Sequence, residues 1–489
     1  MSPLLDSIKG VEDSTLSCKP GMFRDLLETF GANGFLIAFG VLTSIVIARI
    51  LGPEMRGEFA VILLWSGLFS TFVSLGINES LGYFSGVKNI QRWKYLYTSS
   101  IVEAVISLLL IIPLVFLITF LMKNYSMKAV HLGMLSVGFS IFFIPQFMIA
   151  QSFLQGSGLI RYLNLINLLN GLLYFFLVFG VWIFFPRGKH NLSLTTLVYI
   201  GTYAILYFIS FALLIKLKRG DRQLLKEEHL SFGIDELKNL FKYGFPVSIA
   251  NLANQASTKL DQIFLSFLVL PELIGFYTVA LSTAVGISAI ALTVSTIALP
   301  RITNARTIEE RRSAIRKLCL SYCYSSVPVF LLTLAAVPYL VPLLFGSDFM
   351  GAVKASQIVL AGMLLVGTNQ LSVTILKALG LPKYAMTCRV LALGLLAVCL
   401  IALVPKYDII GAAWAVVLSN FAASIIIMGV IGKKAGIKLL GMIIPEKEDM
   451  RIIQQGILQV FRYRLKVNRG YCVEGSAKKH KGAGGNFQT

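Results

Sequence analysis

Seven polar side chains lie close together in residues 244–269, a stretch that is otherwise apolar. They are Asn251, Asn254, Gln255, Thr258, Lys259, Asp261 and Gln262. At 100° per residue along a helix, all seven fall within an arc of about 160°, so one broad face of this helix is polar. Amide, hydroxyl and ammonium groups on one face indicate a helix that lines water or a polar cavity. An ion pair that only joins helices is the alternative for the two charged residues.

Two further charged residues are functional candidates because charges within apolar stretches are costly. Glu103 lies in the apolar stretch 97–121, and Arg49 lies at the end of the stretch 32–50. The planar guanidinium of Arg49 could bind phosphate, or it could extend to the membrane surface. Lys259 and Asp261 are two residues apart, so we expect them to flank the polar face and to find partners on other helices.

The elements that position these residues are membrane spans. The chain has 489 residues, of which 56% are hydrophobic and only 14% are charged, and its mean hydropathy is +0.76. A soluble domain has about 25% charged residues. This composition excludes a soluble enzyme, a disordered chain and a disulfide-rich secreted protein, and it predicts an all-α polytopic membrane protein. The net charge of +20 suggests cytoplasmic loops beside anionic lipid headgroups, and nucleic acid is not an expected partner.

Apolar runs of about twenty residues predict twelve transmembrane helices. They lie at 32–50, 59–83, 97–121, 131–155, 163–185, 194–215, 244–269, 274–299, 319–345, 353–376, 385–404 and 409–431. On this map 35 of the 44 Lys and Arg residues lie on the side of the N-terminus, and 8 lie on the other side. The bias places both termini in the cytoplasm.

The two halves of the sequence resemble each other. Pro53, Glu54, Gly57 and Phe59 match Pro271, Glu272, Gly275 and Tyr277 at an offset of 218 residues. A second match relates residues 158–162 to residues 380–384 at an offset of 222. Because six spans separate the matches, the repeats are parallel, and two such lobes enclose a central cavity in a secondary transporter. A generic helix bundle with recurring turns is the alternative.

These features divide the chain into four regions. Residues 1–217 form an N-terminal lobe of spans 1–6 with an amphipathic lead at 22–30, and 218–243 form a cytoplasmic linker with an interfacial helix. Residues 244–432 form a C-terminal lobe of spans 7–12. Residues 433–489 form a basic cytoplasmic tail with an amphipathic helix at Met450–Val467 and a disordered end at Gly475–Gln488.

Motifs for catalysis and cofactors are absent from the sequence. No phosphate-binding Gly-x-x-x-x-Gly-Lys-Ser/Thr loop occurs, and neither the six cysteines nor the four histidines have metal-ligand spacing. We therefore expect no metal, no cofactor and no ATP hydrolysis. A membrane glycan polymerase would need a sizeable outer loop, and all predicted outer loops are short.

Several segments resemble the Wzx-type flippases of bacterial polysaccharide biosynthesis, within the multidrug/oligosaccharidyl-lipid/polysaccharide exporter superfamily. They are IARILGPEMRGEF at 47–59, the end of the polar face at 259–261, GFYTVA at 275–280, and Phe345-Gly346 with Phe349. The resemblance covers roughly residues 22–432. It implies a two-lobed, twelve-helix protein of the bacterial inner membrane that moves an undecaprenyl-pyrophosphate-linked oligosaccharide, such as an O-antigen or exopolysaccharide unit, to the outer leaflet by alternating access. Other polysaccharide assembly proteins are implied partners.

This resemblance gives the candidate residues roles. Lys259 and Arg49 could pair with phosphate oxygens, and the polar residues at 251, 254, 255, 258 and 262 would line the substrate cavity. Asp261 or Glu103 could take up a proton or a sodium ion. The rival function is a cation-coupled drug antiporter of the same superfamily, which would require an acidic cavity. A scaffold protein is a third alternative, and the polar face at 244–269 argues against it.

Overall fold

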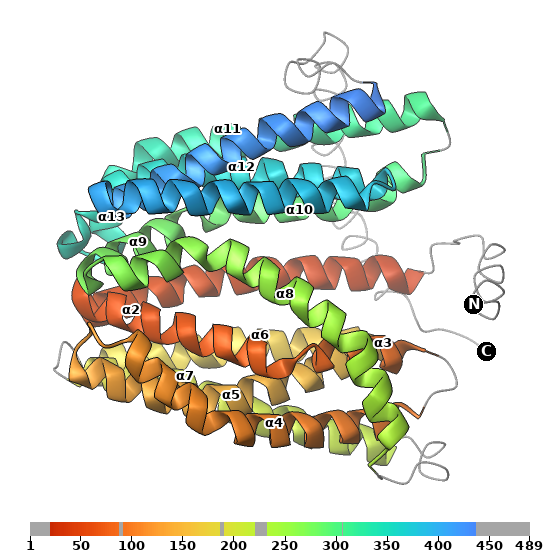
Figure 1. Ribbon diagram of the computed structural model, residues 1–489, viewed down its shortest axis with the longest axis vertical. Helices are drawn as coiled ribbons and strands as arrows, with labels where there is room; N and C mark the ends of the chain where they lie inside the picture. Colours follow the sequence, from red (N-terminus) through yellow and green to blue (C-terminus); the bar gives the residue numbers. More distant parts are fainter. Residues whose placement is uncertain (1–19, 88–90, 186–189, 221–231, 306, 437–489) are drawn as a thin grey trace, which may run out of the picture. The chain divides into compact units, whose positions relative to one another are not determined.

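The computed structural model describes residues 20–87, 91–185, 190–220, 232–305 and 307–436. In these ranges the chain forms helices and no strand. The elements are α2 (Pro20–Ser74), α3 (Ile77–Gly86), α4 (Arg92–Leu121), α5 (Met127–Gly156), α6 (Ile160–Phe184), α7 (Asn191–Gly220), α8 (Ile234–Leu268), α9 (Pro271–Thr283), α10 (Val285–Thr303), α11 (Ile308–Phe345), the 3₁₀ helix η2 (Ser347–Phe349), α12 (Ala352–Ala378) and α13 (Pro382–Ala435) (Figure 1). The all-α prediction is confirmed. The tail segments Met450–Val467 and Gly475–Gln488 lie outside the described residues, as do the side chains of the lead at 22–30.

Nine of the helices in the described ranges are long and apolar enough to cross a membrane. The predicted multi-pass membrane protein is therefore confirmed. These nine helices overlap eleven of the predicted spans, and the remaining span, 244–269, lies on α8. The total of twelve stays a prediction because two of the helices have to contain two spans each.

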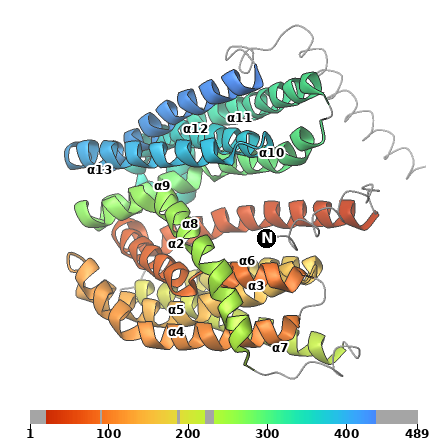
Figure 2. The ribbon, with the colours of Figure 1, turned by 45° about the vertical axis from the view of Figure 1, so that its right-hand side comes forward.

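Those two helices are each broken at a residue with non-helical backbone angles. Gly52 in α2 has φ 71° and ψ 178°, and Asp408 in α13 has φ 49° and ψ −129°. A hydrogen bond of 3.0 Å joins Arg56 to Ser44 across the first kink. Twelve residues of straight helix would separate these side chains by about 18 Å, so α2 folds back on itself at Gly52. Figures 1 and 2 show both arms of α2.

Two predicted spans are interrupted, which corrects the expectation that each is one continuous helix. The span at 59–83 breaks between α2 and α3, where Leu75 and Gly76 have φ of 44° and 76°. There the backbone of Gly76 lies against the carbonyl group of Gly244 on α8, and a Cβ atom at Gly76 would overlap it. The span at 274–299 breaks at Ala284, between α9 and α10.

The chain divides into two compact units. The first comprises residues up to Ala289, Val329–Val366 and Val390–Ala422. One hydrophobic cluster of its core joins α2, α5 and α9 to parts of α11, α12 and α13, with Phe59, Ile141, Tyr277, Val341 and Leu400 fully buried. A second cluster, which includes Leu81, Phe153 and Leu206, lies among α3 to α8. The second unit comprises Ile290–Pro328, Gly367–Arg389 and the residues from Ala423 on. Within it, Ser424 donates a hydrogen bond of 2.8 Å to Asn369.

Serine hydroxyls join α2 to α5 inside the first unit. The Oγ atoms of Ser66 and Ser136 are 2.9 Å apart, and one helical turn later Ser70 Oγ donates to the carbonyl oxygen of Ser140 at 3.1 Å. Small residues and hydroxyl bonds hold transmembrane helices together because lipid provides no hydrophobic drive for their association. These contacts fix the second arm of α2, which carries cavity residues.

Candidate functional site

A cavity of about 360 Å³ lies between the second arm of α2, α8 and α9, within the first unit. It is lined by Arg56, Ala60, Leu63, Leu64, Gly67, Leu68, Gln255, Lys259, Gln262, Thr278 and Leu281. Five of these residues are polar, two of the five are cations, and none is a carboxylate. The lining therefore suits an anionic or strongly polar ligand.

Arg56 enters the cavity because α2 reverses at Gly52 and starts its second arm with Pro53. Its side chain is buried, with 8% of its surface exposed. The Nη2 atom donates to Ser44 Oγ at 3.0 Å, and the Oγ atoms of Ser44 and Ser282 are 2.8 Å apart. The Nε atom is buried and makes no hydrogen bond within the described part of the chain. A guanidinium has five N–H donors, so Arg56 can keep its contact with Ser44 and also bind a phosphate oxygen.

Helix α8 contributes Gln255, Lys259 and Gln262 to the cavity. The spacing of four and three residues places them on one face of the helix. The ammonium group of Lys259 is 3.5 Å from Gln262 Oε1, which is the outer limit of a hydrogen bond. Because an ammonium group has three donors, Lys259 can bind a ligand oxygen and keep this contact.

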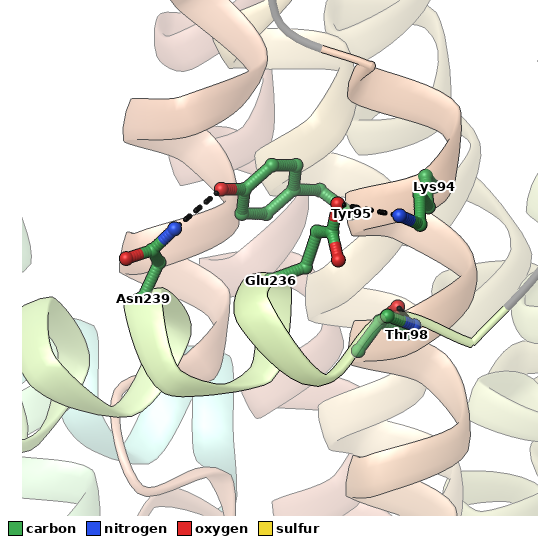
Figure 3. A network of polar contacts seen from close by, with 6 residues as sticks. Lys94, Tyr95, Thr98, Glu236 and Asn239 are labelled. Atoms are coloured by element: carbon green, nitrogen blue, oxygen red, sulfur yellow. Dashed lines mark hydrogen bonds and ion pairs between the residues drawn. The ribbon is translucent and has the colours of Figure 1, made fainter.

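The N-terminal end of α8 is anchored to α4 by a network of polar contacts (Figure 3). Lys94 and Glu236 form an ion pair of 2.8 Å, and Asn239 donates a hydrogen bond to the Tyr95 hydroxyl at 3.1 Å. The backbone amide of residue 233 donates to Thr98 Oγ1. The predicted interfacial helix and span 7 are thus one continuous helix, since α8 runs from Ile234 to Leu268. Fixing its start helps to fix the direction in which its later residues face.

The two carboxylates proposed for ion coupling lie apart from the cavity lining. Asp261 is buried and accepts hydrogen bonds from the Tyr277 hydroxyl on α9, at 2.5 Å, and from the backbone amide of Gln262, at 2.8 Å. Glu103 on α4 is fully buried, and neither carboxyl oxygen has a hydrogen-bond partner among the described residues. A buried carboxylate without a partner is costly when ionised, so Glu103 favours a proton or a cation.

The other predicted residues are placed elsewhere. Arg49 donates from Nε to the carbonyl oxygen of Leu344 at 2.7 Å and from Nη2 to that of Leu343, so it caps the C-terminal end of α11. Asn251 donates to the carboxylate of Glu79 on α3. Thr258 is exposed and does not line the cavity, and the side chain of Asn254 lies outside the described residues.

Two polar residues of the cavity, Arg56 and Thr278, are not among the residues that the sequence predicts for the site. Arg56 lies between the predicted spans 32–50 and 59–83, although Pro53 and Glu54 begin a helix well and place Arg56 in its first turn. Thr278 is a lone hydroxyl in an apolar run, and no local signal distinguishes it from a packing residue.

A second cavity of about 750 Å³ lies within the second unit, between the end of α10 and the start of α11. Its charged lining residues are Arg301, Glu309, Glu310 and Lys317. Cations and carboxylates balance there, in contrast to the first cavity. In the part of the chain that the structure describes, no group of three or more His, Cys, Asp and Glu side chains could hold a metal ion.

Comparisons with known proteins identify a family and several similar folds. The family described as "Polysaccharide biosynthesis protein" matches residues 26–306, more than half of the chain. Comparison with curated proteins finds no match.

Among solved structures, the fold is similar to that of the lipid II flippase MurJ in an inward closed conformation, with a TM-score of 0.69 and 16% identity over 91% of this chain and 100% of the other. It is similar to an inward-facing multidrug resistance MATE transporter of the MOP superfamily, with a TM-score of 0.59 and 13% identity over 83% and 95%. A MOP superfamily transporter from Pyrococcus furiosus has a TM-score of 0.54 and 14% identity over 86% and 96%.

Proposed function

Because the chain belongs to the polysaccharide biosynthesis protein family, we propose that it is a flippase for a polyprenyl-pyrophosphate-linked oligosaccharide. In this proposal it carries the glycolipid from the inner to the outer leaflet of the bacterial inner membrane, and both termini lie in the cytoplasm. The observation that carries the proposal is the charge of the first cavity, where Arg56 and Lys259 are present and no carboxylate is.

The physical problem that such a protein solves is the cost of moving a charged, hydrated headgroup through hydrocarbon. Sugar hydroxyls and a pyrophosphate lose their hydrogen bonds to water there, and each lost bond is costly. Arg56 and Lys259 replace water at the phosphate oxygens with charge-assisted hydrogen bonds. Gln255, Gln262 and Thr278 can bond to further oxygens, while the polyprenyl chain stays in the lipid.

The size of the cavity supports a role in binding the phosphate end of the headgroup. Small-ligand sites measure roughly 300–1,000 Å³. A cavity of about 360 Å³ is therefore near the lower limit, and it fits the pyrophosphate and the adjoining sugar better than a whole oligosaccharide. The remaining sugars would occupy space outside the residues that line this cavity.

Transport of this kind requires the cavity to open alternately on the two sides of the membrane. The sequence repeat supports two parallel six-span lobes, 1–217 and 244–432, that rock against each other. The membrane potential favours outward movement of an anion by about 2.3 kcal/mol per charge per 100 mV. Glu103 is the better candidate for coupling to an ion, because Asp261 already accepts two hydrogen bonds.

A cation-coupled drug antiporter is the second candidate, and the fold of the MATE transporter supports it. An antiporter for cationic drugs would bind its substrate with carboxylates, whereas Arg56 and Lys259 repel a cation. The cavity therefore favours the glycolipid.

The test uses proteoliposomes that contain the purified protein and a fluorescent polyprenyl-pyrophosphate oligosaccharide. An added quencher that stays outside reports how fast the probe crosses the bilayer, with and without an ion gradient. We expect movement that requires the protein and that is lost in Arg56→Gln with Lys259→Gln. The matched control is Lys123→Gln, which removes a cation from an exposed position after α4. Gradient-driven efflux of cationic dyes without probe movement would contradict the proposal.

A further inference from the structure

Helices α2 and α9 pack backbone to backbone next to the cavity. A Cβ atom at Gly57 would overlap the carbonyl oxygen of Pro271, and a Cβ atom at Gly275 would overlap the carbonyl oxygen of Pro53. Both glycines are buried. No side chain separates the two helices at these points, so glycine is required at both positions.

The two contacts are reciprocal with respect to the sequence repeat. Pro53 corresponds to Pro271 and Gly57 corresponds to Gly275, both at an offset of 218 residues. Each glycine therefore packs on the proline of the other repeat. Reciprocal contacts of this kind are expected where a two-fold axis passes between two parallel copies. The contact thus lies where one repeat meets the other.

The same contact lies at one end of the cavity. On α2 the cavity lining begins at Arg56, and on α9 it begins at Thr278, one turn after Gly275. The first arm of α2, which ends at Gly52, makes two further side-chain contacts. Arg49 donates to carbonyl groups at the end of α11, and Ser44 bonds to Ser282 on α9.

We propose that Gly57 and Gly275, packed on Pro271 and Pro53, form a seal that closes this end of the cavity. A ligand passes this end only when α2 and α9 separate. The proposal rests on the alternating access of the proposed function and is independent of the substrate. Glycine suits a seal that must open repeatedly, because it lets two backbones exclude water without interlocking side chains, and only weak C–H···O contacts have to break.

The test measures access to the cavity without any substrate. A single reporter cysteine, Leu68→Cys, is placed in the cavity lining in a protein whose six native cysteines are replaced. A membrane-impermeant maleimide is added to spheroplasts or to inside-out vesicles, so that each side is probed separately. The rate at which the reporter is labelled from the side of the membrane on which the seal lies is compared in wild type, Gly57→Ala, Gly275→Ala and Gly40→Ala. Gly40 lies on the first arm of α2 with nothing within 4 Å of its added Cβ, so it is the matched control.

We expect Gly57→Ala and Gly275→Ala each to raise the rate of labelling from the side of the seal by about tenfold or more, because overpacking a close helix contact drives the helices apart. The Gly40→Ala protein should label like wild type. Unchanged labelling in a folded Gly57→Ala and Gly275→Ala protein would overturn the proposal.

A second variant covers the case in which the alanine proteins fail to fold. Ser44 and Ser282 have Oγ atoms 2.8 Å apart, so cysteines at both positions can form a disulfide. Oxidation of Ser44→Cys with Ser282→Cys should lock the seal, reduce labelling of the reporter from that side to background, and be reversed by a reductant. Labelling that persists in the oxidised protein would refute the seal. If the seal behaves as expected but no glycolipid moves, the proposed substrate is wrong and the seal stands.

Discussion

Removing one cation from the cavity should weaken phosphate binding by an amount that follows from the cavity's size. A sphere of about 360 Å³ has a radius of about 4.4 Å, so a phosphate inside lies roughly 5 Å from both Arg56 and Lys259. At an effective dielectric constant of about 20, two unit charges at about 5 Å interact by about 3 kcal/mol. A hydrogen bond to a charged group contributes a net of about 1.5–3 kcal/mol. Arg56→Gln or Lys259→Gln should therefore lower the affinity by about 10- to 150-fold.

The assay is the binding of a short-chain polyprenyl pyrophosphate to the detergent-solubilised protein, measured by calorimetry for each variant and for the double variant. The same lipid without phosphate is the matched ligand, and Lys123→Gln is the matched protein. If both cations bind one phosphate group, the losses of the two single variants will not add up in the double variant. Affinities that change by less than twofold, or that fall equally for the phosphate-free lipid, would show that these cations do not bind the phosphate.

Three further predictions concern the polar groups around the cavity. Tyr277→Phe removes the hydroxyl donor of the buried Asp261 carboxylate and should cost about 1–3 kcal/mol of stability, measured as a lower midpoint of thermal unfolding; an unchanged midpoint would show that the hydroxyl is not needed. Burial raises the pKa of Glu236, but the hydrogen bond and the charge of Lys94 outweigh burial and hold the pKa below its ordinary value of 4.5. The ion pair therefore stabilises the fold above about pH 4.5, and this stabilisation is lost as the pH falls through the lowered pKa. The midpoint of thermal unfolding of Glu236→Gln should then depend less on pH between 6 and 3 than the midpoint of wild type does. An identical pH dependence of the two proteins would contradict this. Glu103→Gln mimics a protonated carboxyl, so it should abolish the dependence of transport on an ion gradient while leaving protein levels normal. If transport by this variant still depends on the gradient, Glu103 does not couple transport to an ion.

Much of the helix layout could be predicted from the sequence because apolar runs of span length have few alternatives. The positions of the helices and the reversal at Gly52 follow from hydropathy and from the Gly-Pro pair that follows span 1. The break at Leu75 and Gly76 could not be predicted, because it accompanies a close contact with Gly244, which lies more than 160 residues further along the chain. The residues around Leu75 and Gly76 contain no pattern that predicts a contact so far along the chain.

Part of the candidate site could be predicted because helical periodicity is a local property of the sequence. Helical periodicity placed Gln255, Lys259 and Gln262 on one face, and the structure brings these three residues to one cavity. Periodicity does not indicate which helix packs against this face of α8, so it could not predict Arg56 as a cavity residue. For the same reason it could not predict that Arg49 caps α11. The flanking position of Asp261 was predictable, whereas its partner Tyr277 required the packing of α9.

A structure of the protein with a polyprenyl-pyrophosphate glycolipid bound would test most directly whether the first cavity binds the phosphates. We expect density for the pyrophosphate in the cavity between α2, α8 and α9, with its oxygens within hydrogen-bond distance of Arg56 and Lys259. A headgroup that binds elsewhere, for example beside Arg301 and Lys317 in the second cavity, with the first cavity empty, would contradict it.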